Sequence, residues 1–540
     1  MNRHRYAVCA LLLGSLTLSA CGGTAADAGD QPRQGGTLVY ATGDDEPTCL
    51  DPQKGGNVAQ ALLGTQHLQT LFYQNSSGEI LPWLATSWKQ AADGLSWTIE
   101  IRENVKFSDG TALDADAVKA NLDRIASPQT LSNTGRLALA KVASVEVTGP
   151  HTVRVDLKQP DGALLESLAQ VWLPIESPTA FARGLDTNCL HPVGTGPYMV
   201  ESWTKQDSVT LVRNPFFTTP PPDVAHTGPA YLDKIVWRFV PDGTSRFAAL
   251  QSGQVHVIDV VEPQNAVAAK GNPTLRTLIA PRPGEPVELE LNTGRAPFDD
   301  IRVRQAFFAS IDVAGALRSV YLGTVPQSTS LLSSATRFNV PAPRHAYDPA
   351  AAAALLDQAG WAGRDADGYR VRDGKRLSVV LPYSRFIPLE NGFYEQLQAT
   401  AKKTGFEVKL QPLETAKWWI ANNTWAYDAI PVYYTKNSPD VLRITYTTAA
   451  LAESTPGSYH ANTVHLKSAD LDRLLEEASQ TSDDARRGSL YQQAQELLGA
   501  GSYTLPIYDQ QTRLAHQTKV RGLRLQPSLA MPDLYDVWIA

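Results

Sequence analysis

Apolar and polar residues alternate along several short stretches of the chain. Trp97, Ile99 and Ile101 are separated by polar residues, and this period of two predicts a strand with one buried face. The same alternation occurs at residues 153–157, 235–239, 287–291 and 406–410. We expect a strand in each stretch, with one side against the core and a more polar side opposite.

Other stretches have the spacing of amphipathic helices. Asp114 is suited to cap a helix in which Val118, Leu122 and Ile125 share one face. Further helices are predicted from Asp348-Pro349 and the alanine run before Gly360, from the segment ending near Gly405, and from Leu471, Leu474, Leu475 and Ala478. Asp-Gly pairs on both sides of residues 369–372 predict a hairpin strand. Helices and strands mix along the whole chain, which indicates an α/β fold.

The N-terminus has the layout of an export signal. Arg3 and Arg5 precede an apolar stretch at residues 6–18 that is too short to span a bilayer. It ends in Leu18-Ser19-Ala20-Cys21-Gly22, which resembles the lipobox of bacterial lipoproteins. We therefore expect a signal peptide at residues 1–20, lipidation of Cys21, and a flexible tether at residues 21–35, whose Gly, Ala, Asp and Gln cannot form a core. The alternative is an ordinary signal peptide that contains a cysteine.

Length and charge narrow the class of protein. The chain has 540 residues, long enough for two or more domain-sized units, and no second apolar run long enough to span a bilayer. Its formal charge is −7, and removal of residues 1–20 takes away two arginines and leaves −9. An acidic chain without a basic run is a poor candidate for binding nucleic acid. We expect an extracytoplasmic globular body on a lipid anchor.

Cysteine usage agrees with export. Cys9 lies in the signal region and Cys21 is the lipidation candidate, so Cys49 and Cys189 remain. Both lie in polar, turn-like sequence, which favours one disulfide in an oxidising compartment. Two buried free thiols are the alternative.

Known catalytic motifs are missing from the sequence. It contains no Gly-x-Ser-x-Gly elbow, no Walker A loop and no His-Glu-x-x-His. His460 and His465 are the closest pair of histidines, and a spacing of five is not that of two ligands on one helix face. We expect no catalytic activity, no metal site and no cofactor.

A series of short motifs then points to a family. In order they are Gly35-Gly36-Thr37-Leu38, Leu50-Asp51-Pro52, Leu81-Pro82-Trp83-Leu84-Ala85, Val105-Lys106-Phe107-Ser108-Asp109-Gly110, Val193-Gly194-Thr195-Gly196-Pro197-Tyr198, Arg213-Asn214-Pro215, and Leu291-Asn292-Thr293 with Pro297-Phe298-Asp299-Asp300 and Arg302-Val303-Arg304-Gln305-Ala306. Each is weak alone, but their order and spacing over nearly the whole mature chain are specific. The chain resembles the family 5 extracellular solute-binding proteins, the dipeptide, oligopeptide and nickel class of ABC-importer receptors.

The resemblance implies a periplasmic-binding-protein-like α/β fold of class II, in its large three-segment form, with a ligand cleft between two lobes. Lobe I would contain residues 36–70, 198–284 and 504–540, with a subdomain at residues 71–197, and lobe II would contain residues 285–503. The lobes would close on the ligand about a hinge. The partners would be a peptide or peptide-like solute and separate permease and ATPase chains, and we expect the receptor to be a monomer.

The resemblance also locates candidate ligand-binding residues. Peptide binders of this family commonly pair an aspartate with the free amino group of the peptide, just before a segment that ends in Pro-Asp. Here Tyr433 and Tyr434 precede that region, and Asp440 matches the Pro-Asp aspartate. The acidic position has no clear counterpart, and Lys436 stands close to it. A lysine would meet a carboxylate or phosphate instead; the alternative is that Lys436 points into solvent.

Four more residues complete the candidate set. Trp418 and Trp419 would form a flat wall for a ligand of mixed side chains, or would belong to the core. Asn292 would contact a ligand carbonyl, or would cap the end of its own strand. Arg385 would meet an acidic group, or would lie on the surface.

Three functions remain open at this point. The first is an importer receptor for di- or oligopeptides or a peptide-like solute. The second is a receptor for a nickel complex, a metallophore or another small anionic molecule, which would give Lys436 or an arginine a role. The third is a surface peptide hydrolase, for which the sequence offers no nucleophile and base to nominate.

Overall fold

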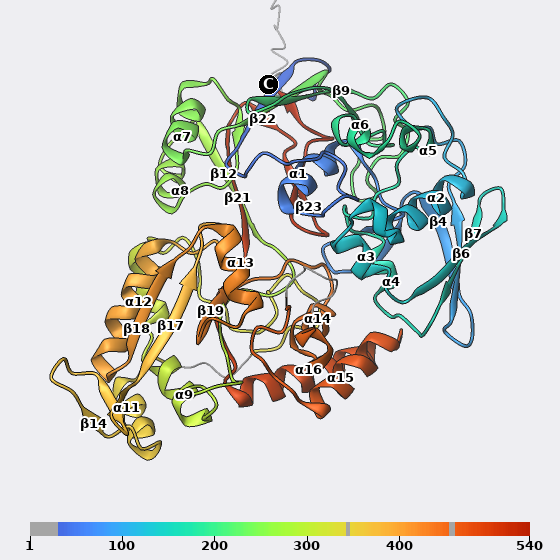
Figure 1. Ribbon diagram of the computed structural model, residues 1–540. Helices are drawn as coiled ribbons and strands as arrows, with labels where there is room; N and C mark the ends of the chain where they lie inside the picture. The colour runs from blue at the N-terminus through green and yellow to red at the C-terminus, as the bar shows by residue number, and fades with distance from the viewer. Residues whose placement is uncertain (1–30, 342–345, 453–459) are drawn as a thin grey trace, which may run out of the picture.

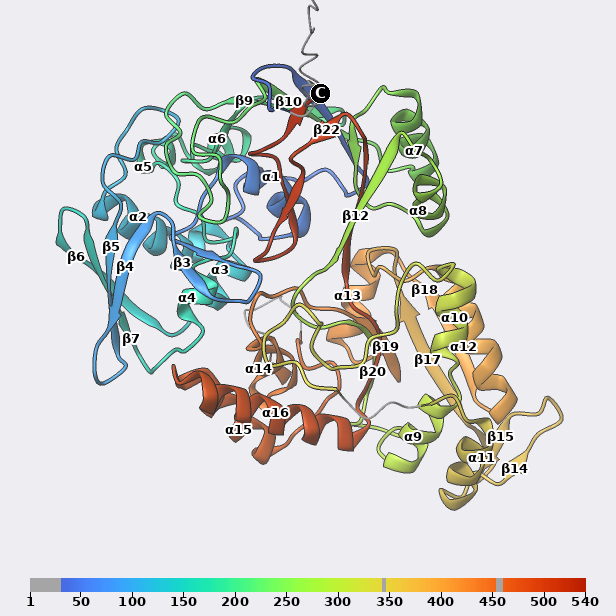
Figure 2. The same cartoon turned by 180° about the vertical axis from the view of Figure 1, so that it is seen from behind.

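The computed structural model describes residues 31–341, 346–452 and 460–540. The described chain forms two lobes of mixed helices and strands (Figures 1 and 2). None of its helices combines the length and the apolar character needed to cross a membrane.

The first lobe is organised around a seven-stranded sheet. In sheet order its strands are β12 (Leu275–Pro281), β21 (Gln511–Gln517), β11 (Val257–Ile258), β1 (Thr37–Thr42), β10 (Lys234–Phe239), β9 (Ser208–Arg213) and β8 (Tyr198–Thr204). Strand β1 is parallel to both of its neighbours, β10 and β11. The other elements are α1 (Val58–His67), α7 (Gly243–Ser252), α8 (Pro263–Lys270), β22 (Val520–Arg521), β23 (Arg524–Gln526), β24 (Met531–Asp533) and β25 (Trp538–Ile539).

A second sheet in this lobe contains β4 (Ala85–Gln90), β5 (Ser96–Ile101), β7 (Thr152–Leu157) and β6 (Val142–Gly149), in that order. Around it lie β2 (Phe72–Gln74), β3 (Ile80–Pro82), α2 (Ala115–Ala126), η1 (Pro128–Thr130), α3 (Thr134–Ala138), α4 (Leu164–Ser167), α5 (Pro178–Phe181) and α6 (Leu185–Leu190). Asp114 caps α2 by accepting a hydrogen bond from the Ala117 N–H at 2.8 Å. The predicted strand and capped helix are both confirmed.

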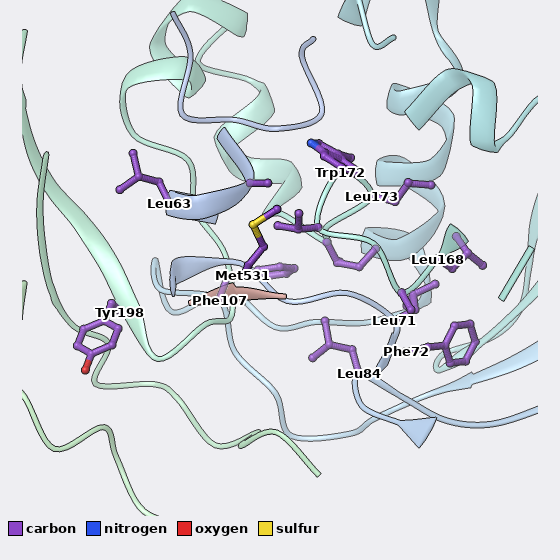
Figure 3. Packing of buried hydrophobic residues seen from close by; sticks show 14 of the residues in the cluster. Leu63, Leu71, Phe72, Leu84, Phe107, Leu168, Trp172, Leu173, Tyr198 and Met531 are labelled. Atoms are coloured by element: carbon purple, nitrogen blue, oxygen red, sulfur yellow. The ribbon is translucent and has the colours of Figure 1, made fainter. Parts of the chain in front are cut away.

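One hydrophobic core joins these parts of the first lobe. Tyr198 from the large sheet, Phe107 and Leu168 from the region of the second sheet, and Met531 from the C-terminal stretch belong to one buried cluster (Figure 3). Because the chain returns to this core near its end, the lobe is discontinuous in sequence.

The second lobe contains a three-stranded sheet. In sheet order its strands are β19 (Ala429–Val432), β13 (Val287–Leu291) and β20 (Thr504–Tyr508). Its other strands are β14 (Gly363–Arg364), β15 (Arg370–Arg372), β16 (Lys375–Arg376), β17 (Ser378–Tyr383) and β18 (Glu407–Pro412). Its helices are α9 (Ile301–Ala309), α10 (Val313–Val320), α11 (Pro349–Gln358), α12 (Asn391–Thr404), α13 (Thr415–Asn423), α14 (Val441–Tyr446), η2 (Thr448–Leu451), α15 (Ala469–Gln480) and α16 (Asp484–Gly501). The helices predicted before Gly360 and Gly405 and near Leu471 are confirmed, as is the hairpin strand.

Strand β13 departs from the alternating pattern. All five of its residues are buried, including Glu288 and Glu290, which were predicted to lie on a more polar face. The reason is tertiary: β13 is the middle strand of its sheet, and Tyr446 of α14 and Thr463 donate hydrogen bonds to these glutamates. The strand is confirmed, but the exposure of one face is wrong.

Two crossings connect the lobes. Strand β12 leads through residues 282–286 into β13, and β20 leads back through residues 509–510 into β21 (Figure 2). The boundary predicted at residue 504 falls before β20, which pairs with β13 of the second lobe. The crossings lie side by side, since the Arg282 N–H donates to the Gln510 carbonyl at 2.7 Å.

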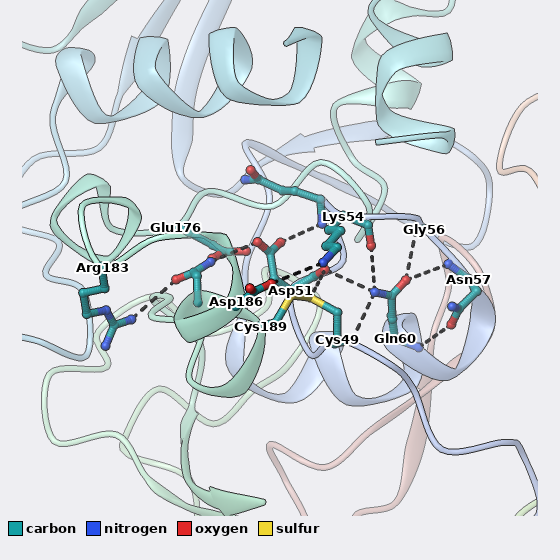
Figure 4. Close-up of a disulfide and its surroundings, with 12 residues drawn as sticks. Cys49, Asp51, Lys54, Gly56, Asn57, Gln60, Glu176, Arg183, Asp186 and Cys189 are labelled. Carbon is teal, nitrogen blue, oxygen red and sulfur yellow. Dashed lines mark hydrogen bonds and ion pairs between the residues drawn. A yellow bond between two sulfur atoms is a disulfide. The ribbon is translucent and has the colours of Figure 1, made fainter. Parts of the chain in front are cut away.

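A disulfide stabilises the first lobe. Cys49 and Cys189, which are 140 residues apart, are bonded to each other (Figure 4). Both are buried, and Cys189 belongs to the short helix α6, so the turn-like context predicted for it is wrong. A crosslink over so long a loop typically contributes about 2–4 kcal/mol to stability.

Candidate functional site

Four of the predicted site residues lie on one segment, between β19 and α14. This segment runs along the first crossing, where the Glu285 N–H donates to the Tyr434 carbonyl at 2.8 Å and Gly284 forms a bridge with Thr435. Gly284 has a φ of +110°, and a Cβ there would lie 2.1 Å from the Tyr434 oxygen. Glycine therefore permits the close approach that holds the segment at the hinge.

Lys436 is buried within this segment. Only 8% of the residue is exposed, so the alternative of a lysine in solvent is wrong. Burial lowers the pKa of its ammonium, and the nearby carboxylate of Asp440 acts in the opposite direction. Within the described part of the chain, no hydrogen bond or ion pair reaches the ammonium. A buried ammonium has three donors and a charge to satisfy, so this position lacks an acceptor.

Asp440 is already paired. Its two carboxylate oxygens accept from Arg443 Nε at 2.8 Å and Nη2 at 3.0 Å. Burial alone would raise the pKa of Asp440, but the guanidinium of Arg443 holds it below the usual value. A carboxylate engaged in a bidentate pair is not free to receive an ammonium group, so Asp440 serves as the partner of Arg443.

A buried ion pair joins the two lobes beside this segment. Arg487 of α16 donates from both terminal nitrogens to Glu166 of α4, at 3.1 Å each, and the Ser438 hydroxyl donates to the same carboxylate. Both side chains of the ion pair are about 95% buried. The sequence analysis missed this contact, although Glu166 stands alone in the apolar run at residues 163–169, and a lone acid there was a usable signal.

Asn437 adds neutral contacts across the same interface. Its side-chain amide donates to the Glu166 carbonyl at 2.7 Å and to the Ser528 hydroxyl at 3.3 Å, and its side-chain oxygen accepts from Gln170. Its own carbonyl accepts from Gln74 at 3.1 Å. The four partners belong to the first lobe, so the lobes are in direct contact here.

Charged side chains gather around this interface, and most of them have a partner. We define the inter-lobe charge cluster as Lys141, Asp161, Glu166, Lys436, Asp440, Arg443 and Arg487, which act electrostatically on one another. Each arginine of the cluster already has a carboxylate, and Glu476 adds a further acidic charge beside Arg443. Lys141 donates to the Ser479 hydroxyl at 2.8 Å. Among the described residues, Lys436 is therefore the basic side chain of this cluster that lacks a hydrogen-bond or ion-pair acceptor.

The tryptophans have different positions. Trp418 is 2% exposed and belongs to the core of the second lobe, so the core alternative holds for it. Trp419 is half-buried and stacks on Phe386 with ring centroids 5.7 Å apart. The Tyr433 hydroxyl reaches the Phe386 carbonyl at 3.5 Å. Trp419, Phe386 and Tyr433 thus form an aromatic wall, and Phe386 was not predicted.

Asn292 and Arg385 are the remaining predicted residues. Asn292 is buried, donates to the Tyr427 carbonyl at 3.2 Å and accepts from the Gly294 N–H at 3.1 Å. Its side chain caps the end of its own strand, which is the alternative given for it, and the ligand contact stays a prediction. Arg385 is exposed and lies 3.8 Å from Asp45 of the first lobe, a pair that bridges the lobes at the surface.

The lipidation of Cys21 and the metal ligands are the remaining predictions about sites. Cys21 lies outside the described residues. Within the described ranges, no group of three or more His, Cys, Asp or Glu is arranged to hold a metal ion.

Comparison with known proteins agrees with this architecture. The model of the family described as bacterial extracellular solute-binding proteins, family 5 Middle, matches residues 79–455. A glutathione-binding protein, GsiB of Shigella flexneri, is 26% identical, and the alignment covers 97% of each chain.

Solved structures show the same fold. NikA of Brucella suis, determined with Fe(III)-EDTA, has a TM-score of 0.82 at 24% identity, over 94% of this chain and all of NikA. The oligopeptide-binding protein AppA of Bacillus subtilis, determined with a nonapeptide, has a TM-score of 0.75 at 23% identity, over 94% of this chain and all of AppA. The predicted α/β fold is confirmed.

The family match covers well over half of the chain, and the family consists of solute-binding proteins that are not enzymes. This removes the hydrolase from the three functions left open by the sequence. The chain belongs to the family 5 bacterial extracellular solute-binding proteins, the extracytoplasmic substrate-binding components of ABC importers.

Proposed function

We propose that this receptor captures a short peptide or peptide-like solute that carries a free carboxylate, and that closure about the two crossings delivers it to the permease. The observation that carries the proposal is the buried ammonium of Lys436, which has no hydrogen-bond or ion-pair partner among the described residues. A cargo carboxylate would supply the missing acceptor in a site closed to water, where a charge-assisted hydrogen bond is strong.

The relatives support a cargo of this kind. GsiB is named for glutathione, a short peptide with two carboxylates, and AppA holds a nonapeptide. Lys436 stands close to the position where peptide binders of the family have an aspartate. Because two cations repel, Lys436 argues against binding the amino group of a peptide at this position. The carboxylate end is therefore the end we assign to Lys436.

An anionic metal chelate is the second candidate. NikA was determined with Fe(III)-EDTA, a chelate rich in carboxylates, and an unmatched lysine suits such a cargo as well. Native mass spectrometry of the soluble form beginning at Gly22, purified without added ligand, separates the two. A retained mass with the composition of a short peptide supports the first candidate, and an adduct that contains a metal supports the second.

Lys436→Met tests the carboxylate contact. The probes are a panel of tripeptides, each as the free acid and as the C-terminal amide. We expect the wild-type protein to bind a free acid about 10–100-fold more tightly than its amide, because a hydrogen bond to a charged group is worth about 1.5–3 kcal/mol. Lys436→Met should remove that difference in isothermal titration calorimetry.

Lys417→Met is the matched control, since Lys417 is exposed on α13. It should keep the preference for free acids. Equal binding of acids and amides by the wild-type protein would place the cargo carboxylate away from Lys436.

We also propose that the receptor acts as a monomer held at the outer face of the cell membrane by a lipid on Cys21. The lipobox-like string at residues 18–22 supports the anchor. Cys21→Ala should move the protein from the membrane fraction to the soluble fraction on immunoblots of fractionated cells. Retention of that variant with the membranes would contradict the proposal.

A further inference from the structure

A second group of polar side chains converges at the hinge end of the lobe interface. Asp44 follows β1 of the first lobe, Arg282 lies on the first crossing, and Tyr433 follows β19 of the second lobe. The Arg385–Asp45 pair and the contact of Tyr433 with Phe386 bring the turn after β1 close to Tyr433. The charges of Asp44 and Arg282 both act on the Tyr433 hydroxyl.

The polar ends of these three residues lack strong partners in the described part of the chain. Arg282 donates through Nε to the Thr512 hydroxyl at 2.9 Å, which leaves its two terminal nitrogens available. Among residues 31–341, 346–452 and 460–540, Asp44 forms a hydrogen bond only through its main-chain N–H, to the Thr42 hydroxyl at 3.1 Å. All three residues are half-buried. Burial raises the pKa of Asp44, while Arg282 opposes that shift.

The turn that presents Asp44 is held in place by several hydrogen bonds. Asp259 accepts from the Gly43 N–H at 2.7 Å and from the Thr42 hydroxyl at 2.8 Å. The guanidinium of Arg246 lies against Gly43, where a Cβ would come within 2.5 Å of it, and donates to the Asp259 carbonyl at 3.1 Å. This support fixes the direction of Asp44 before any ligand arrives, which lowers the entropy cost of binding.

We infer that Asp44, Arg282 and Tyr433 form a head-group site that receives a free α-amino-acid group of the cargo. Asp44 would pair with the ammonium, Arg282 would pair with the carboxylate, and the aromatic wall would cover the adjacent methylene groups. The inference deepens the proposed function and rests on it, because it places a second end of the same cargo.

The head-group site distinguishes two kinds of peptide. A γ-linked glutamyl peptide carries an ammonium and a carboxylate on one carbon, so it can engage Asp44 and Arg282 together. An α-linked isomer has the same atoms and charges, but its amino-terminal carbon bears an ammonium and an amide. Both isomers keep the C-terminal carboxylate assigned to Lys436.

The experiment compares γ-Glu-Cys-Gly with Glu-Cys-Gly, and γ-Glu-Ala with Glu-Ala, by isothermal titration calorimetry. We expect the γ-linked isomer of each pair to bind at least tenfold more tightly. Asp44→Asn and Arg282→Gln should each reduce that preference to less than threefold. Asp116→Asn, on an exposed position of α2, should preserve it. Thermal melts of the variants verify that they are folded.

Equal or tighter binding of the α-linked isomers would overturn the head-group site and leave the proposed function standing. If other tripeptide acids bind but no γ-linked peptide does, the head-group site is likewise overturned and the proposed function stands. If no peptide of any panel binds, both the head-group site and the proposed peptide cargo are overturned.

Discussion

Glu166→Gln is expected to open the unliganded protein. Arg487 would remain buried at the lobe interface without its carboxylate, and such a loss costs about 3–5 kcal/mol. In an open form Arg487 can be hydrated, so the cost falls on the closed form rather than on folding. The ratio of closed to open molecules should fall about a hundredfold or more. Small-angle X-ray scattering should record this as a larger radius of gyration.

Two further variants make this prediction specific. Asp484→Asn removes an exposed ion pair with Arg337, at 2.8 Å, and should leave the scattering unchanged because exposed pairs contribute little. The double variant Glu166→Met with Arg487→Met should restore the compact form, since apolar side chains of similar volume can replace a buried pair. An unchanged radius of gyration for Glu166→Gln would mean that the ion pair does not hold the lobes together.

Glu288→Gln is expected to stabilise the protein at alkaline pH. Burial raises the pKa of Glu288 to about 8, although hydroxyl groups of Thr504 and Tyr446 oppose the shift. Glu285 and Glu290 are buried beside it with raised pKa values, and none of the three forms an ion pair within the described part of the chain. Folding therefore keeps a proton on Glu288 that the unfolded chain releases near pH 4.3.

The direction in which stability changes with pH follows from the number of bound protons. Between about pH 4 and 8 the unfolded chain binds fewer protons than the folded protein, so the free energy of unfolding falls as the pH rises through this window. The contribution of Glu288 to the free energy of unfolding is highest below the pKa that this glutamate has in the unfolded chain. Glutamine keeps the shape without the proton, and it should raise the free energy of unfolding at pH 8 by an amount on the order of a few kcal/mol.

Chemical denaturation at pH 5, 6.5 and 8 measures this effect. The slope of stability against pH should be flatter for Glu288→Gln than for the wild-type protein. Glu496→Gln, which changes an exposed glutamate on α16, is the control and should retain the wild-type slope. Parallel slopes for all three proteins would show that Glu288 is ionised in the folded state.

Local structure and family membership were predictable from the amino-acid sequence. Asp114 caps its helix, Gly405 ends another helix with a φ of +107°, and residues 153–157 form a strand. These outcomes depend on the conformational preferences and hydrogen bonds of residues that are near one another in the chain, so a single sequence contains the necessary information. The ordered motifs identified the family for the same reason, because each is a short string of adjacent residues.

Which side chains meet, and how deeply they are buried, depends on packing between distant parts of the chain. Nothing near Lys436 in the sequence distinguishes a buried lysine from one in solvent, and the strand pattern at Glu288 predicted a polar face. Glu166 and Arg487 are 321 residues apart, and they meet because two crossings bring the lobes together. Burial and charge balance depend on all elements packed around a group. For that reason the inter-lobe charge cluster and the head-group site became visible only in the folded chain.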